Sequence, residues 1–199
     1  MVMKKIISLF QRNYETDKLV RNEVVPGAEW VLNGEGVATR KFDGTCCMLR
    51  DGKLYKRYEV KPGGKPPENF EPANDVDANT GKQQGWLPVG DGPEDQWHRE
   101  AYETMRSFIE SSPPFSNNGT FELVGPKVQG NPEKFNKHML VSHFTEDRQF
   151  DFEGDQPPRD FDGLRTWLGS HECEGIVWHH PDGRMVKIKR KDFFKRGDA

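Results

Sequence analysis

The chain has 199 residues, of which 33% are hydrophobic and 31% charged, and its formal net charge is −3. This length corresponds to a single domain, which we expect to span residues 1–199. No run of about 18 apolar residues is present, so we expect no membrane-spanning helix and no membrane partner. The charge balance excludes a globally basic nucleic-acid-binding protein, although it allows a local basic patch.

The three cysteines, Cys46, Cys47 and Cys173, are too few and odd in number for a disulfide framework. This usage is typical of a reducing compartment, and we expect a cytoplasmic protein in which Cys46 and Cys47 pack within a strand. The segment Met1–Phe10 is basic and then apolar, but its apolar part is too short for a signal peptide. The 13 Phe, 5 Trp and 4 Tyr residues argue against disorder, because disordered chains are poor in aromatic residues.

The first half of the chain predicts short strands, one long loop and one helix. Strands are expected over Gly36–Phe42, Thr45–Arg50 and Lys53–Tyr58, the last two joined by an Asp-Gly turn. The stretch Lys61–Pro93 holds six prolines and six glycines, which predicts a long functional or mobile loop. A helix is expected over Glu94–Glu110, because apolar residues recur there at helical spacing. Those residues are Trp97, Ala101, Met105 and Phe108.

The second half predicts more strands and a shorter helix. The expected elements are strands over Thr120–Val124 and Met139–Phe144, a loop over Glu153–Pro158, a helix over Asp160–Leu168, and a hairpin of Gly175–His179 with Met185–Lys189. Strands mixed with few helices, without regular alternation of strand and helix, predict an α+β fold with antiparallel sheets.

The tetrapeptide Lys-Phe-Asp-Gly at 41–44 places a lysine at the end of a predicted strand. A lysine becomes a nucleophile when neighbouring cations or burial favour its neutral amine. Taken alone, the motif is explained as well by a turn at Asp43-Gly44 beside a solvated Lys41.

Four further motifs follow in order. They are a basic pair at 56–57, an aromatic-Glu-x-x-Gly element at 121–125, Glu-Gly-Ile-Val at 174–177 and Lys-x-Lys at 187–189. Lys187 and Lys189 are two apart on a predicted strand and therefore point to the same face. Two cations on one face suit a triphosphate, and a carboxylate such as Glu174 is a suitable ligand for the magnesium that bridges its phosphates.

In this order, the motifs resemble motifs I, Ia, III, IV and V of the covalent nucleotidyltransferases, which comprise nucleic-acid ligases and messenger-RNA capping enzymes. Longer strings are similar to those of the small ATP-dependent RNA 5′-to-3′ ligases, a family with a vertebrate member and phage and bacterial relatives. The strings, within a resemblance from Gly36 to Asp192, are KFDGTCC (41–47), KRYEVK (56–61), FELVGPKVQGNP (121–132) and EGIVWHH (174–180). The resemblance implies an adenylyltransferase (nucleotidyltransferase) domain whose two antiparallel sheets flank a nucleotide cleft.

The resemblance also implies a role for each matching residue. Lys41 would attack the α-phosphate of ATP, while Lys187 and Lys189 would neutralise that phosphate and favour the neutral amine of Lys41. Glu174 would bind Mg²⁺, with Mn²⁺ as an alternative metal. The implied nucleotide-binding residues are Arg57 on ribose or phosphate, Glu122 on the ribose, and Asp43 and Gly44 in the turn after the nucleophile.

The implied activity is that of an RNA ligase that joins a 5′-phosphate to a 3′-hydroxyl through a lysyl-AMP and an RNA-adenylate, as RNA repair requires. The alternatives are a capping-type guanylyltransferase and a catalytically idle RNA-binding module. Ten residues follow Lys189, too few for the OB-fold that DNA ligases and capping enzymes usually append, so no C-terminal OB-fold is expected. From the residues alone, Glu122 is equally a strand-edge carboxylate and Arg57 a salt-bridge partner within a hairpin.

Three further features stay open at this stage. The aromatic side chain that would stack on adenine is one of three: Phe121, Phe144 or Trp178. Four metal-ligating residues lie close together without a zinc spacing: His171, Cys173, His179 and His180. Seven basic residues from Arg184 to Arg196 form either a solvated tail or a track for RNA phosphates, and a function is favoured only for Lys187 and Lys189.

Overall fold

The structure, a computed structural model, describes residues 6–111, 118–145, 148 and 151–195, with the backbone alone for 108–111. Within these ranges the chain forms two compact units. The central unit takes residues 43–144, and the terminal unit takes residues 6–42 together with 145–195. The chain leaves the terminal unit after Phe42 and re-enters it after Phe144. The expected single domain over residues 1–199 stays a prediction.

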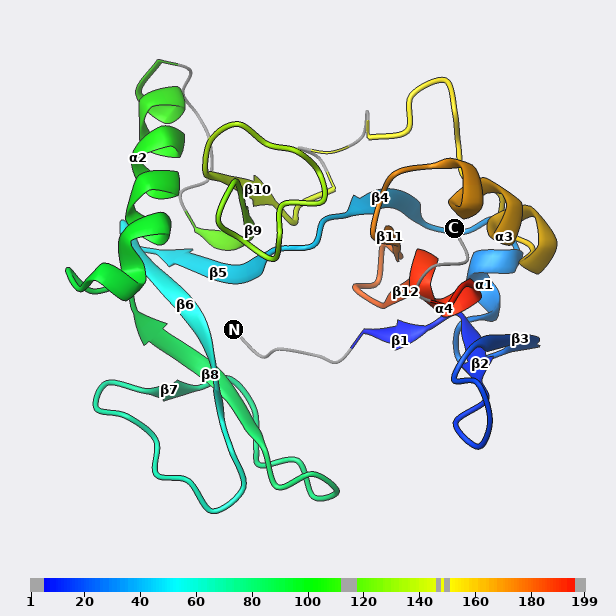
Figure 1. The fold of residues 1–199 in the computed structure, drawn as a ribbon, viewed down its shortest axis with the longest axis horizontal. Coiled ribbons are helices and arrows are strands. Elements are labelled where there is room, and N and C mark those ends of the chain that lie inside the picture. The colour runs from blue at the N-terminus through cyan, green and yellow to red at the C-terminus, as the bar shows by residue number, and fades with distance from the viewer. Residues whose placement is uncertain (1–5, 112–117, 146–147, 149–150, 196–199) are drawn as a thin grey trace. The chain divides into compact units, whose positions relative to one another are not determined.

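The central unit is built on a six-stranded antiparallel sheet with the strand order β10-β9-β5-β6-β8-β7 (Figure 1). Its strands are β5 (Thr45–Arg50), β6 (Lys53–Val60), β7 (Glu71–Pro72), β8 (Gln83–Pro88), β9 (Gly119–Val124) and β10 (Met139–Ser142). A 3₁₀ turn, η1 (Pro93–Asp95), leads into the helix α2 (Gln96–Ser111). Between β5 and β6, Asp51 and Gly52 adopt φ values of 51° and 74°, the left-handed pair that a two-residue hairpin turn favours.

Helix α2 covers one face of the six-stranded sheet. Its Ala101 is fully buried, and the half-buried Tyr102 and Met105 pack against the same apolar cluster. The strands contribute the buried residues Cys47, Leu49, Leu54, Phe121, Leu123 and Leu140. The helical spacing therefore predicted the buried side of α2, although the side chain of Phe108 lies outside the described part of the chain.

The stretch rich in proline and glycine contains two strands that the sequence did not predict. Strand β8 pairs with β6 from Val60 to Tyr55, which also makes β6 longer than expected. Gly85 has no room for a side chain, because a Cβ there would lie 2.3 Å from the ring of Phe70. Trp86 is 2% exposed and packs with Met48, Tyr55 and Ala73. The expectation of an unbroken loop over Lys61–Pro93 is therefore wrong, because one buried tryptophan and one close backbone approach anchor this segment.

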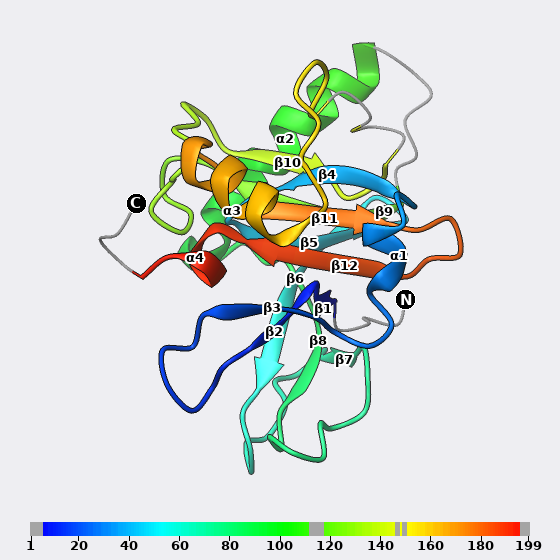
Figure 2. The same cartoon turned by 90° about the vertical axis from the view of Figure 1, so that its right-hand side faces the viewer.

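The terminal unit is built on a four-stranded sheet with the order β1-β12-β11-β4 and a separate pair of strands, β2 and β3 (Figure 2). Its strands are β1 (Ile7–Ser8), β2 (Phe10–Arg12), β3 (Val20–Val24), β4 (Val37–Lys41), β11 (Gly175–His179) and β12 (Met185–Lys189). Its helices are α1 (Glu29–Leu32), α3 (Phe161–Ser170) and α4 (Arg190–Phe193). Strands β4, β11 and β12 are antiparallel neighbours, and β1 alone runs parallel to β12.

One face of the four-stranded sheet carries the core of the terminal unit. Ile176 and Trp178 on β11 are fully buried, and α3 packs Leu164 and Leu168 into the same cluster. The Asp160 side chain caps α3 by accepting a hydrogen bond from the Gly163 backbone N–H at 2.8 Å. Because successive strand residues point to opposite faces, the residues between these core positions point to the other face of the sheet.

The N-terminal segment is part of this core, which the sequence did not predict. Leu9 and Phe10 are fully buried, and the Leu9 N–H donates to the Lys187 carbonyl at 2.8 Å. The interpretation of Met1–Phe10 falls partly outside the described residues, since those begin at residue 6. Antiparallel sheets with few helices confirm the predicted α+β class, whereas the nucleotidyltransferase fold stays a prediction. In the described ranges, no helix has the length and apolar character needed to cross a bilayer.

Candidate active site

Two predicted site lysines flank one glycine on the four-stranded sheet. In the register of the strands, Lys41 of β4 lies directly opposite Gly175 of β11, and Lys189 of β12 lies opposite the same glycine from the other side. Residues directly opposite one another share a face of the sheet. The chain thus brings together two side chains that are 148 positions apart, both aimed away from the core.

Glu174 joins these two lysines. Its Oε2 accepts a hydrogen bond from the Lys41 Nζ at 2.5 Å, and its Oε1 accepts one from the Lys189 Nζ. The carboxylate side chain is only 9% exposed. A carboxylate with so little solvent around it requires compensating charge, and the two ammonium groups supply it.

Gly175 is the residue that allows this arrangement. A Cβ at that position would lie 2.1 Å from the Ile188 carbonyl oxygen and 2.8 Å from the Lys189 Cα. No side chain fits at such distances, so the Glu-Gly pair in the sequence reflects the close approach of β11 to β12.

Lys187 lies on the same face of the sheet, one row away. It is opposite Val177 of β11, which is in turn opposite Thr39 of β4. Burial lowers the pKa of Lys187 below its ordinary value, and the neighbouring charges of Lys189 and Lys41 lower this pKa further. Glu174 acts in the opposite direction without outweighing these effects. A cation that is only weakly compensated is suited to receive an anion.

A histidine of the β11 strand occupies the next position on this face. The ring Nε2 of His179 lies 2.9 Å from the Oγ1 of Thr39, whose side chain is fully buried. The lysine-bearing face therefore carries a polar row beyond the charged cluster. The sequence grouped His179 with a doubtful zinc set, and its position on the strand explains it instead as a member of this face.

In the central unit, the carboxylate of Glu122 is held on both oxygens. Oε1 accepts a hydrogen bond from the Gly44 N–H at 3.1 Å, and Oε2 lies 3.2 Å from the Nε2 of His143. A Cβ on Gly44 would lie 2.2 Å from the Leu123 carbonyl oxygen. The glycine of the Lys-Phe-Asp-Gly motif is thus required by the close approach of β9. His143 was not among the predicted site residues, and its place after β10 gave no sequence signal.

The basic pair at 56–57 is divided between the two faces of the six-stranded sheet. The Lys56 Nζ donates to the nearly buried carboxylate of Asp95 at 2.5 Å. Burial alone would raise the pKa of Asp95, but the hydrogen bonds from Lys56 and the Gly90 N–H lower it below its ordinary value. Arg57 is exposed, and its Nε donates to the Gln84 Oε1 at 2.9 Å. Lys56 is therefore a structural ion-pair partner, and Arg57 is the member that faces solvent.

The remaining candidates separate by burial. Among the three aromatic side chains considered for adenine stacking, Trp178 is fully buried and Phe121 is 4% exposed, both inside apolar clusters. Phe144 is 38% exposed and is the one of the three whose ring is accessible for stacking on a base. Asp43 is half-buried at the start of the central unit.

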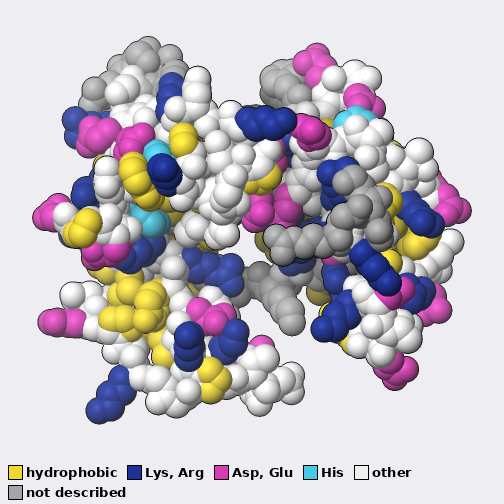
Figure 3. Space-filling model, in the orientation of Figure 1, with side chains coloured by type: hydrophobic (Ala, Val, Ile, Leu, Met, Phe, Trp, Pro, Cys, Tyr) yellow, Lys and Arg dark blue, Asp and Glu magenta, His cyan; other side chains and the backbone are white. Residues whose placement is uncertain are grey.

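The basic run from Arg184 onwards does not form one stripe. Arg184 pairs with Asp182 at 2.7 Å, and Arg190 donates to the Gly169 carbonyl at 3.3 Å. Arg196 lies outside the described residues. Figure 3 shows Lys and Arg side chains dispersed among acidic ones on the visible face. In the described ranges, no three side chains of His, Cys, Asp or Glu gather as a metal site would require.

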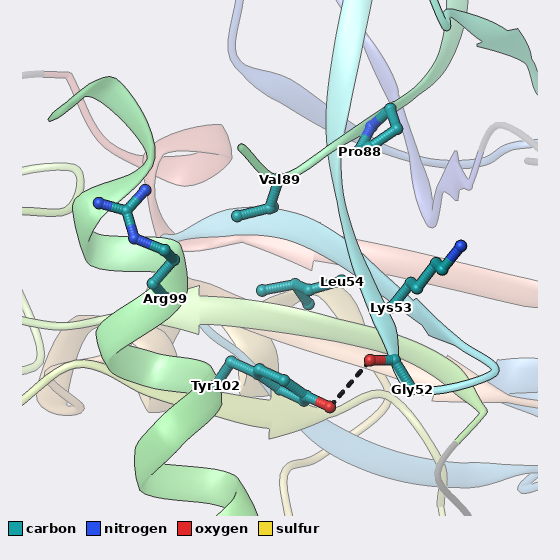
Figure 4. Close-up of a pocket in the computed structure, with 7 residues that line it drawn as sticks. All are labelled: Gly52, Lys53, Leu54, Pro88, Val89, Arg99 and Tyr102. Carbon is teal, nitrogen blue, oxygen red and sulfur yellow. Dashed lines mark hydrogen bonds between the residues drawn. The ribbon is translucent and has the colours of Figure 1, made fainter. Parts of the chain in front are cut away.

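A surface pocket of about 260 Å³ lies elsewhere in the central unit. Its lining comes from the β5–β6 turn, β6, β8 and the residue after it, and α2: Gly52, Lys53, Leu54, Pro88, Val89, Arg99 and Tyr102 (Figure 4). The Tyr102 hydroxyl donates to the Gly52 carbonyl at 3.0 Å across this pocket. None of the predicted site residues lines it, so the candidate chemistry rests on the clusters described above.

Comparison with known proteins places the chain among relatives that are RNA ligases. The family model of RNA ligase 1 matches residues 99–195, which include β9, Glu174, Lys187 and Lys189. The match thus covers the motifs from Glu122 onwards, and Lys41 lies before it.

Similar proteins include RNA ligase 1 of several vertebrates. The mouse protein (Mus musculus) and the rat protein (Rattus norvegicus) are each 26% identical to this chain over an alignment of 243 positions, which covers 90% of this chain and 74% of theirs. The orangutan protein (Pongo abelii) is 26% identical over 77% of this chain and 66% of its own length. These similarities confirm the predicted resemblance to RNA ligases.

Proposed function

We propose that this protein is an ATP-dependent RNA ligase that joins a 5′-phosphate to a 3′-hydroxyl, with Lys41 as its nucleophile. The observation that carries the proposal is the cluster of Lys41, Glu174, Lys187 and Lys189 on one face of the four-stranded sheet. A structural role accounts poorly for three lysines on the same face of a sheet, of which a single carboxylate pairs with two, because like charges repel. The RNA ligase relatives supply independent support.

In the first step, the neutral amine of Lys41 attacks the α-phosphate of ATP. A P–N bond forms, the bond from that phosphorus to the bridging oxygen breaks, pyrophosphate leaves, and the amine loses a proton. Lys187 and Lys189 neutralise the charge that develops on the α-phosphate oxygens, which is the form of catalysis that contributes most in such transfers. The lowered pKa of Lys187 supports this role, since its charge is poorly compensated before an anion arrives.

In the second step, an oxygen of the RNA 5′-phosphate attacks the same phosphorus, and the P–N bond to Lys41 breaks as the amine regains a proton. In the third step, the RNA 3′-hydroxyl attacks the activated 5′-phosphate, loses its proton, and AMP leaves. Glu122 and the exposed Arg57 are assigned to the nucleotide, with ribose as the partner of Glu122. Asp43 and Gly44 are assigned to the turn that follows the nucleophile.

Glu174 is the residue assigned to hold Mg²⁺, with Mn²⁺ as the alternative. The donor set fits an ion that takes one protein carboxylate and completes its coordination with phosphate oxygens and water, as magnesium does in phosphoryl-transfer sites. The ion would supply charge neutralisation at the phosphates. Each oxygen of Glu174 accepts one lysine hydrogen bond here, so an ion would bind at the remaining lone pairs or displace one of the lysines.

The test is covalent labelling. The protein is incubated with [α-³²P]ATP and Mg²⁺ and then denatured, and we expect label on the polypeptide that a 5′-phosphorylated RNA removes. A parallel reaction with [γ-³²P]ATP controls for phosphorylation and is expected to leave the polypeptide unlabelled. Preferential labelling by [α-³²P]GTP would favour the capping-type alternative, and RNA binding without any label would favour the idle module.

The preference for RNA is tested with nicked duplexes that differ only in the sugar at the 3′-hydroxyl end. Nicks whose 3′-terminal nucleotides carry ribose are expected to be sealed faster than nicks whose 3′-terminal nucleotides carry deoxyribose. Equal rates would remove RNA specificity from the proposal while leaving the ligase chemistry intact.

A further inference from the structure

We propose that Arg148 and Asp151 are positioning residues that hold the end of strand β4 in place and thereby aim Lys41 at its target. This inference rests on the proposed role of Lys41 as the nucleophile. It concerns two side chains that none of the motifs includes and that lie more than 100 positions from Lys41 in the sequence.

The first observation is the position of β4. In the sheet order β1-β12-β11-β4, β4 is an edge strand, and β11 is its single neighbour among the described residues. An edge strand leaves every second residue with its N–H and C=O directed away from the sheet, where no strand satisfies them. A nucleophile at the end of such a strand is poorly fixed unless another group replaces the missing neighbour.

The second observation is that two side chains replace that neighbour at Arg40. The Arg40 N–H donates to the Asp151 Oδ2 at 2.8 Å, and the Arg40 carbonyl accepts from the Arg148 guanidinium. The same Arg148 nitrogen lies 2.5 Å from the Asp151 Oδ2. The three groups form a closed ring of hydrogen bonds in which Arg148 and Asp151 supply the donor and acceptor of an absent strand. We refer to this ring as the edge clamp.

The third observation concerns the residue on the other side of Lys41. The Arg148 guanidinium lies 5.1 Å from the centroid of the Phe42 ring, and the Arg40 guanidinium lies 5.5 Å from it. Both distances are within the range of cation–π contact. The residues before and after Lys41 are thus both held by Arg148, which leaves Lys41 little freedom at its backbone.

Burial indicates that the edge clamp is a built feature rather than a surface ion pair. Arg148 is 7% exposed, and the Asp151 side chain is 17% exposed. A buried guanidinium is costly unless its donors are satisfied. Nη2 of Arg148 donates to the Arg40 carbonyl and to the Asp151 carboxylate, whereas its buried Nε has no hydrogen-bond partner among the described residues. The Asp151 N–H also donates to the Arg148 carbonyl, and the Arg148 N–H donates to the Thr145 carbonyl.

The chain offers a matched control at the opposite end of the same strand. Arg159 also donates to backbone carbonyls, those of Val31, Glu35 and Gly36, just before β4 begins. Replacing Arg159 therefore removes a guanidinium that binds the segment leading into β4, without touching the Lys41 end. A general loss of stability affects both variants, whereas a positioning role belongs to Arg148 alone.

The experiment compares Arg148→Met, Arg148→Lys, Asp151→Asn and Arg159→Met. Single-turnover formation of the Lys41 adenylate at saturating ATP is expected to fall about 10–100-fold in Arg148→Met, because small misplacements of a reacting atom cost this much. The KM for ATP is expected to stay within about twofold, since ground-state binding is unaffected. Arg148→Lys is expected to lie between, and Arg159→Met to react at the wild-type rate.

The second readout is hydrogen exchange of the Arg40 amide, followed by NMR. This amide is expected to be protected in the wild type and in Arg159→Met, and to exchange faster in Arg148→Met and Asp151→Asn. Wild-type adenylation in a folded Arg148→Met, equal losses in Arg148→Met and Arg159→Met, or an Arg40 amide unprotected in the wild type would overturn the proposal. If Arg148→Met does not fold, Asp151→Asn decides by the same criteria, because it preserves the size of the side chain.

The two readouts also separate this inference from the proposed function. If the wild type forms no adenylate while the Arg40 amide loses protection in Arg148→Met alone, the ligase proposal fails and the edge clamp is reduced to a structural device. If the wild type forms the adenylate and Arg148→Met forms it equally fast, the ligase proposal stands and the positioning role fails.

Discussion

The two sheets use their polar motif residues in different ways. On the four-stranded sheet, Lys41, Lys189 and Glu174 make direct contact, and Lys187 lies one row away with a lowered pKa. On the six-stranded sheet, the carboxylate of Glu122 contacts the Gly44 N–H and His143. Lys56 forms a structural ion pair with Asp95. Charge is concentrated on the first sheet and neutralised locally on the second. The proposed function assigns the covalent chemistry to residues of the first sheet and nucleotide recognition to residues of the second.

The largest effect that this comparison predicts is at Lys41. Lys41→Arg keeps the positive charge opposite Glu174, but a guanidinium stays protonated at neutral pH and is no nucleophile. We expect adenylate formation to fall by on the order of 1,000-fold or more. The measurement is label from [α-³²P]ATP on the denatured protein. Lys191→Arg, an exposed lysine on α4, is the matched control and should label normally. Undiminished labelling of Lys41→Arg would place the nucleophile elsewhere.

Glu174→Gln is expected to have the next largest effect. The amide loses the negative charge that Lys41 and Lys189 share and that would attract a divalent cation. We expect a fall of about 100-fold in adenylation rate, partly restored by raised Mg²⁺ or Mn²⁺. The rate is measured against metal concentration for the variant and for Asp162→Asn, an exposed control on α3. A metal dependence identical to that of the wild type would contradict the assignment of Glu174.

Lys187→Met is expected to lower the adenylation rate while raising the free energy of unfolding near pH 7. Its adenylation rate at saturating ATP should fall about 10–100-fold, and the pH profile should move to higher pH, because one like charge no longer favours the neutral amine of Lys41. The pKa of Lys187 is lowered in the folded state. The unfolded chain therefore binds more protons between this lowered pKa and the ordinary value of 10.5, and wild-type stability rises with pH across that window.

In Lys187→Met that rise should disappear, and the free energy of unfolding near pH 7 should be higher than in the wild type. Thermal unfolding from pH 7 to 10 measures both effects. A variant that is destabilised at pH 7 and reacts at the wild-type rate would make Lys187 an ordinary packing residue of the strand.

The smallest catalytic effects are expected on the six-stranded sheet, where Lys56 and Arg57 should behave in opposite ways. Lys56→Met leaves the nearly buried Asp95 without its cation and should cost about 3 kcal/mol of unfolding free energy. Arg57→Ala should change stability by under about 0.5 kcal/mol and raise the KM for ATP a fewfold. Chemical denaturation and ATP titrations of adenylation measure these two quantities.

The pH dependence sharpens this contrast. The pKa of Asp95 is lowered in the folded state, so its ion pair contributes stability above the ordinary pKa of 3.8 and loses it as pH falls through the lowered value. The difference in unfolding free energy between Lys56→Met and the wild type should therefore shrink as the pH falls. Arg57→Ala should follow the wild type at every pH. If the free energy of unfolding depends on acidic pH in the same way in Lys56→Met and in the wild type, the Lys56–Asp95 pair has no stabilising role.

Local signals in the sequence predicted the strands that position the candidate site. The bounds of β5, β11 and β12 agree with the expected ranges, because turn residues such as Asp51-Gly52 mark the ends of alternating segments. The spacing of two between Lys187 and Lys189 also placed both on one face correctly. Such features depend on neighbouring residues, and single-sequence reasoning reaches them.

Features that depend on distant partners were not predictable in this way. Strand β8 is defined by the packing of Phe70 on Gly85 and by the burial of Trp86, which no periodic pattern reveals. The fully buried Leu9, between β1 and β2, is anchored by a hydrogen bond to the carbonyl of Lys187 in β12, nearly 180 residues later. Likewise, the bond between Arg148 and the Arg40 carbonyl joins residues 108 positions apart. Register and edge pairing are tertiary properties, and they decide what faces Lys41.

The division of the chain into two units has a consequence for biosynthesis. The terminal unit is discontinuous, since residues 6–42 emerge from the ribosome before the central unit and residues 145–195 emerge after it. Lys41 is therefore translated early, but Glu174 and Lys189, its neighbours on the finished sheet, are among the last described residues to appear. A nascent or prematurely terminated chain carries the lysine without the surroundings that would activate it. On the proposed function, a chain that stops before β12 is therefore expected to form no adenylate at Lys41.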